Sequence, residues 1–174
     1  MSSHSRVIET LLQHGVDIDS RDDDGWTALH CAANSGYAGV VRLLHSFGAD
    51  RDARENDGWT GLHCAAMDGH MEVGELLVAE VEARDSDGST PLHLATDREH
   101  EKFAGLLLEQ GAEVNARDED GWAPLHCAAV NRHVGVVKGL LEGGAEKEAE
   151  DERGYTPRMF AELNGYAEVV KLLN

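Results

Sequence analysis

Three His-Cys pairs are the residues of this chain whose chemistry stands out first. Imidazole and thiolate form a donor set that binds zinc, and the pairs are His30-Cys31, His63-Cys64 and His126-Cys127. The pairs recur in one register, so on stacked helices neighbouring cysteines would lie about 8–10 Å apart, too far for a shared zinc or a disulfide. We therefore expect packing positions here and no metal site. We expect the same of His70, His100 and His133, which fall after the same segments.

Other catalytic or ligand-binding motifs are not found in the sequence. It has no Gly-x-Ser-x-Gly, no Gly-rich phosphate loop and no His-Glu-x-x-His. The acid-rich stretch from Asp17 to Asp24 lacks the twelve-residue calcium loop that ends in Glu, which leaves at most weak cation binding by an acidic turn. We therefore expect no catalytic residues, no cofactor and no enzymatic activity.

The charge balance restricts the partners further. Thirty-three Asp and Glu residues against 15 Lys and Arg give the 174-residue chain a net charge of −18, which repels the phosphates of nucleic acids. No apolar run is long enough to span a membrane, and Met1 to Arg6 lack the apolar stretch of a secretory signal. The three cysteines are an odd count and indicate reduced thiols, so we expect an intracellular protein, cytoplasmic or nuclear.

The elements that position the His-Cys pairs recur along the chain. Similar blocks start at Gly25, Gly58, Gly88, Gly121 and Gly154. Each block reads as turn, helix, turn and helix, and the expected N-caps of the first helices are Thr27, Thr60, Thr90 and Thr156. The glycines expected to end these helices are Gly36, Gly69 and Gly165. One such unit cannot bury its own apolar face, so the units must stack.

The segment Thr90-Pro-Leu-His-Leu-Ala95, the 33-residue period and the stretch from Gly111 to Asp118 resemble the ankyrin repeat family. The resemblance covers nearly the whole chain. It implies an all-α solenoid of stacked helix-turn-helix units with β-turn or hairpin fingers. It also implies a concave groove, formed by the fingers and the first helices, that binds other proteins without catalysis.

The chain divides as a single ankyrin-repeat domain over residues 1–174. We expect a partial N-terminal repeat at 5–21, repeat 1 at 22–54, a shortened repeat 2 at 55–84, repeat 3 at 85–117, repeat 4 at 118–150 and a C-terminal capping repeat at 151–174. Repeat 2 lacks three residues after Leu77, which indicates either a deletion that strains the next loop or a gap closed up in the numbering. Glu99 and Arg132 replace the first-helix glycine in repeats 3 and 4.

The residue after the turn glycine is aromatic in four blocks, at Trp26, Trp59, Trp122 and Tyr155. These rings could anchor a partner or pack on the neighbouring finger, and the two roles are compatible. The predicted groove adds Asp23, Asp24, Asn56, Asp57, Asp87, Glu119 and Asp120 from the turns, and Asn34, Ser35, Met67, Asp68, Asp97, Arg98, Val130 and Asn131 from the first-helix ends. An aromatic and acidic groove favours a basic or arginine-bearing protein segment.

Asn115, within Glu113-Val-Asn-Ala116, resembles the turn asparagine that is hydroxylated in some ankyrin repeats, and the alternative is an ordinary hydrogen-bonding turn residue. The sequence favours a protein-binding scaffold. The alternatives are a targeting or inhibitory segment of a larger enzyme or receptor, and an array that self-assembles through its uncapped end. At that end, Ile8, Leu11 and Leu12 lack a partner helix. Otherwise we expect a monomer.

Overall fold

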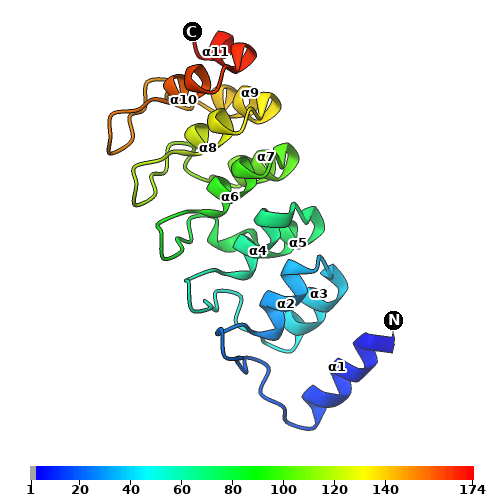
Figure 1. Ribbon diagram of the computed structural model, residues 1–174. Helices are drawn as coiled ribbons and strands as arrows, with labels where there is room; N and C mark the ends of the chain where they lie inside the picture. The colour runs from blue at the N-terminus through cyan, green and yellow to red at the C-terminus, as the bar shows by residue number, and fades with distance from the viewer. Residues whose placement is uncertain (1–2) are drawn as a thin grey trace.

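The computed structural model describes residues 3–174, without the side chains of residues 3–5 and 12. In this range eleven α-helices and one short 3₁₀ helix, η1, follow one another in an elongated stack, and long turns project from one side as fingers (Figure 1). The N-terminus and the C-terminus lie at opposite ends of the stack. The predicted all-α repeat solenoid is confirmed.

Each repeat supplies one helix to an inner layer beside the fingers and one to an outer layer. The inner, first helices are α2 (Ala28–Asn34), α4 (Gly61–Asp68), α6 (Pro91–Asp97), α8 (Pro124–Val130) and α10 (Pro157–Leu163). The outer, second helices are α1 (Ser3–Gln13), α3 (Ala38–Ser46), α5 (Met71–Leu77), α7 (Glu101–Glu109), α9 (Val134–Glu142) and α11 (Ala167–Leu173), and η1 spans Val78–Glu80. Helices of one layer pack on their neighbours in that layer, as the stacking argument requires.

A histidine caps most of the first helices from the inside. In α6, the Nδ1 atom of buried His93 accepts the backbone N–H of Thr90 and lies 2.9 Å from the Thr90 hydroxyl oxygen. Repeat 4 has Ala123 in place of threonine, yet His126 Nδ1 still accepts the Ala123 N–H at 3.0 Å. The cap therefore depends on the histidine, and the threonine adds to it. In α10, which has Met159 in place of the histidine, the predicted N-cap works through the Thr156 hydroxyl alone.

A residue one or two positions after the end of each first helix adopts a left-handed backbone conformation. Gly36, Gly69 and Gly165 do so with φ values of 70°, 70° and 73°. Glu99 and Arg132 take the same conformation without being glycine, with φ values of 62° and 64°. For an L-residue this conformation costs about 1–2 kcal/mol. Glu99 has one compensating contact, because its Oε2 lies 3.7 Å from His133 Nδ1.

The substitution Arg132→Gly should raise the free energy of unfolding by about 1 kcal/mol, because glycine adopts this conformation without the Cβ penalty. Urea denaturation followed by circular dichroism measures the change. Glu99→Gly is the matched control and should gain less, because it removes the contact with His133. A decrease in stability for Arg132→Gly would contradict the strain argument.

The shortened repeat closes through η1. In repeats 1, 3 and 4 the second helix ends in a Gly-Ala turn whose alanine is buried, at Ala49, Ala112 and Ala145. Repeat 2 lacks this turn, and η1 leads directly from Leu77 into the next finger. The φ values of Leu77, Val78 and Val81 are −113°, −65° and −60°, so the chain passes the shortened segment with ordinary backbone angles.

In the outer layer, a glycine of α5 lies beside a large aromatic side chain of α7. Gly74 of α5 occupies the position that Val41 and Val137 fill in other repeats, and Phe103 of α7 replaces the valine found at Val136. A Cβ atom on Gly74 would lie 2.6 Å from two carbon atoms of the Phe103 ring. The ring is fully buried, so it fills the space that the glycine leaves.

Candidate functional site

Each finger is held by an acidic side chain at its start. In repeat 4, Asp118 Oδ1 accepts the backbone N–H groups of Asp120 and Trp122 at 3.0 and 2.8 Å. The residues with this role in the five fingers are Asp22, Glu55, Asp85, Asp118 and Asp151. Their carboxylates form part of the turn itself, so they contribute to the fold before they contribute to any surface.

The acids at the tips of the fingers are exposed. Neighbouring fingers are joined by one backbone hydrogen bond, such as the Glu119 N–H donated to the Asp87 carbonyl at 2.9 Å. The bond uses backbone atoms only, and the Asn56 side chain adds a hydrogen bond of 3.2 Å to the Asp23 carbonyl. All seven predicted turn residues are exposed in this row, namely Asp23, Asp24, Asn56, Asp57, Asp87, Glu119 and Asp120. Sequence reasoning missed Glu152, which continues the row and is also exposed.

Arginines at the bases of the fingers donate hydrogen bonds to backbone carbonyl groups. Arg84 Nη1 donates to the Gly88 carbonyl of its own finger at 2.9 Å and to the Arg117 carbonyl of the next one at 2.5 Å. Arg54 and Arg117 make the same two kinds of bond. These cations therefore bind the scaffold, and the carboxylates of the tips face solvent beyond them.

The aromatic residue of each finger is anchored at its base and accessible at its edge. Trp26, Trp59 and Trp122 are half-buried, with ring centroids 6.0–6.2 Å from the capping histidine of their own repeat. Tyr155 is more open, with 41% of its surface exposed. Packing and partner contact are thus compatible, because each ring is held in place and retains exposed area.

The capping histidines also join each repeat to the next. His93 Nε2 lies 3.0 Å from the Trp122 carbonyl, and His126 Nε2 lies 3.1 Å from the Tyr155 carbonyl. Since Nδ1 accepts a backbone N–H, Nε2 must carry the proton that it donates, and the imidazole is neutral. Burial lowers the pKa of His63 to about 4, and it also lowers the pKa values of His93 and His126.

The cysteines behave in two ways. Cys64 and Cys127 are buried as expected, and burial raises the pKa of the Cys64 thiol to about 12. The expectation of packing is wrong for Cys31, which is exposed because, among the described residues, no first helix packs on the N-terminal side of α2. Over residues 3–174, no three His, Cys, Asp or Glu side chains gather in a way that could hold a metal ion.

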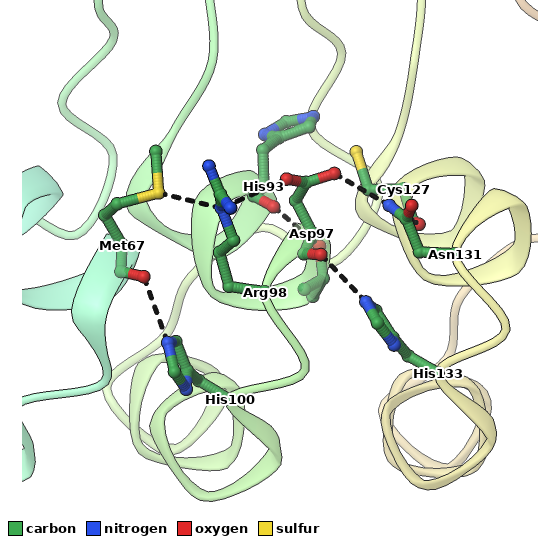
Figure 2. A network of polar contacts seen from close by, with 9 residues as sticks. Met67, His93, Asp97, Arg98, His100, Cys127, Asn131 and His133 are labelled. Carbon is green, nitrogen blue, oxygen red and sulfur yellow. Dashed lines mark hydrogen bonds and ion pairs between the residues drawn. The ribbon is translucent and has the colours of Figure 1, made fainter.

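A network of polar contacts links the ends of the first helices (Figure 2). The amide nitrogen of Asn131 donates to Asp97 Oδ1 at 2.8 Å, and Arg98 lies between the Met67 sulfur, 3.1 Å away, and the second Asp97 oxygen, 3.5 Å away. Four of the predicted helix-end residues, Met67, Asp97, Arg98 and Asn131, are thus brought together, while Asp68 is exposed. These residues bridge three consecutive repeats.

His70, His100 and His133 each tie an outer helix to the inner helix of the preceding repeat. His100 Nε2 lies 3.0 Å from the Met67 carbonyl, and His133 Nε2 lies 2.8 Å from the Asp97 carbonyl (Figure 2). His70 makes the equivalent contact with Asn34. The sequence predicted packing residues at these positions, and the structure shows specific bonds between repeats.

The repeating unit of finger, capped inner helix and outer helix agrees with the family models that match this chain. A family model of three ankyrin repeats matches residues 37–118 and 115–174, and a second ankyrin model matches residues 1–45. This chain belongs to the ankyrin repeat family. Proteins of this family generally bind other proteins, so the finger surface of the ankyrin array is the candidate functional site.

One curated protein matches part of this ankyrin chain. It is the mouse protein phosphatase 1 regulatory subunit 27, with 45% identity over 40 residues. The match covers 23% of this chain and 26% of that relative. Among the described residues, the ankyrin array has no helix with the length and apolar character of a membrane span.

Asn115 lies in the ankyrin turn between repeats 3 and 4, where its side chain bridges two repeats. Its Oδ1 accepts the Glu146 N–H at 2.9 Å, and its amide nitrogen lies 3.4 Å from the Gly144 carbonyl. These bonds give the residue a structural role in joining the turns. Hydroxylation at Asn115 stays a prediction.

Proposed function

We propose that this ankyrin array is a non-catalytic scaffold that binds a basic segment of a partner protein along its fingers and first helices. The observation that carries the proposal is the row of exposed tip acids beside the anchored rings of Trp26, Trp59, Trp122 and Tyr155. The partial relative is called a regulatory subunit, a name that fits a binding role.

The two components of this surface have different physical roles. Carboxylates at the tips attract a basic segment over a distance of about 8–10 Å at physiological salt and speed its association. The rings give contact area at low entropic cost, because packing on the capping histidines already fixes their positions. The nearby arginines Arg54, Arg84 and Arg117 keep their positive charge, but the exposed acids at the finger tips outnumber them, and their guanidinium groups are held at the finger bases by bonds to carbonyls.

Neutralising the finger tips should weaken binding to a basic peptide by at least tenfold. The variant carries Asp24→Asn, Asp57→Asn, Asp87→Asn and Asp120→Asn, which keep the backbone bonds between fingers. Titration calorimetry with a synthetic lysine- and arginine-rich octapeptide at about 50, 150 and 400 mM salt measures the affinity. Binding to the unmodified protein should weaken as salt rises, and the variant should show a smaller salt dependence.

The matched control removes the same charge from the outer helices. It carries glutamine at the exposed outer-helix positions Glu75, Glu109, Glu142 and Glu168. This control should keep most of the affinity, because its changes lie away from the fingers. Equal losses in both variants would show a general effect of net charge, and an absence of binding at low salt would overturn the proposal.

A further inference from the structure

A hollow of about 430 Å³ lies between the last two fingers and α10. Its lining residues are Asp120, Trp122, Asp151, Glu152, Arg153, Tyr155, Phe160 and Leu163. We propose that this hollow receives the guanidinium group of an arginine in the partner's segment. The inference rests on the proposed function and assigns a specific subsite within it.

Phe160 builds one wall of this hollow. In the earlier repeats this position of the first helix is occupied by smaller residues, at Cys31, Cys64, Leu94 and Cys127. The Phe160 ring centroid lies 4.9 Å from that of Trp122 and 5.6 Å from that of Tyr155. Three rings from two fingers and one helix therefore meet around the same space.

The positions of the rings are fixed from behind. Trp122 packs on His126 with ring centroids 6.0 Å apart, and His126 Nε2 lies 3.1 Å from the Tyr155 carbonyl. Asp151 holds the last finger, because its Oδ1 accepts the backbone N–H groups of Arg153 and Tyr155 at 2.9 and 2.8 Å. A preorganised wall of this kind loses little conformational freedom when a side chain enters.

The charges at the hollow select a cation. Three carboxylates line it, from Asp120, Asp151 and Glu152, against the single guanidinium of Arg153. Asp120 and Glu152 are exposed at the rim, while Asp151 is 8% exposed. A planar guanidinium stacks on aromatic faces and donates to carboxylates in the same pose, and a compact ammonium does this less well. The chemistry therefore favours arginine over lysine.

The test uses three synthetic octapeptides on the full chain. They share seven lysine and glycine residues and carry arginine, lysine or neutral citrulline at the central position. In ¹⁵N NMR spectra the arginine peptide should shift the Trp122 indole signal more than those of Trp26 and Trp59. Citrulline or lysine at the central position should weaken binding by about fivefold.

Three variants locate the effect. Tyr155→Ala, at an exposed ring, should reduce affinity for the arginine peptide by about fivefold. Arg153→Gln should strengthen it by about twofold to fivefold, because a like charge leaves the rim. The control Tyr37→Ala changes a ring that is 63% exposed next to α3 and should leave the affinity unchanged. Circular dichroism verifies that each variant is folded.

The outcomes separate this inference from the proposed function. If all three peptides bind equally and Tyr155→Ala has no effect, the arginine site is wrong and the binding of basic segments still stands. If no peptide binds at low salt, the proposed function is wrong, and the subsite is overturned with it. A selective shift of the Trp122 indole signal, together with a loss of peptide affinity in Tyr155→Ala, supports both the arginine site and the proposed function.

Discussion

The double variant Gly74→Val with Phe103→Val should be within about 1 kcal/mol of the original chain in unfolding free energy, although each single change destabilises it. Phe103→Val alone leaves a cavity beside Gly74 and should cost about 3 kcal/mol. Gly74→Val alone places its Cβ 2.6 Å from the Phe103 ring and should cost about 2 kcal/mol through overpacking. Together the two changes recreate the pair of valines that stands at the equivalent positions of α3 and α5, Val41 and Val73.

A double-mutant cycle from urea denaturation measures this coupling, which we expect to be about 4–5 kcal/mol. Gly139→Val in α9 is the matched control, since a Cβ atom there meets no neighbour within 4 Å. Its effect should add to that of Phe103→Val without coupling. Additive losses in the pair Gly74→Val and Phe103→Val would show that the ring and the glycine are not packed on each other.

The array should lose stability when the pH falls from about 6.5 to about 4, because buried capping histidines stay neutral in the fold and accept protons once unfolded. The unfolded chain binds more protons in this range, so stability increases with pH there and is fully present above the ordinary histidine pKa of 6.5. His63 alone, with its pKa lowered to about 4, contributes about 3 kcal/mol. His93 and His126 act in the same direction.

Unfolding free energies from urea titrations at half-unit pH steps measure the effect. His63→Gln should flatten the pH dependence below 6.5, because it removes one of the protons taken up on unfolding. Leu163→Gln, at an exposed position without an ionisable side chain, should leave the pH dependence unchanged. A stability that stays constant between pH 7 and 4.5 would contradict the assignment of neutral, buried imidazoles.

The repeat architecture could be predicted because every local signal agreed in phase. Thr90, Pro91 and His93 occupy the positions that begin a helix, and Gly69 stands where one ends. The backbone conformation at positions that depart from the pattern could not be predicted in the same way. The sequence places Arg132 at a glycine position but does not show whether the chain keeps the left-handed backbone there, which the neighbouring helices impose.

The candidate site was predicted in part. The tip acids and the finger aromatics follow from the period, since each stands at a fixed offset from a turn glycine. The role of Phe160 did not follow, because its contacts with Trp122 and Tyr155 join residues from two repeats. The exposure of Cys31 was missed for a similar reason, since it depends on which helices the chain provides around α2.

Acids in neighbouring positions of a finger are subject to different structural constraints. Asp118 can be replaced only by a side chain that accepts the same two N–H groups, as Glu55 does in its finger, whereas Glu119 and Asp120 contribute only backbone atoms. The tip side chains can therefore change in charge or size while the backbone bonds that hold the fingers are kept. Substitution of two tip residues in each finger could therefore redirect the array to new partners, in evolution or by design. A library of variants could randomise these tip positions without a separate selection for folded proteins.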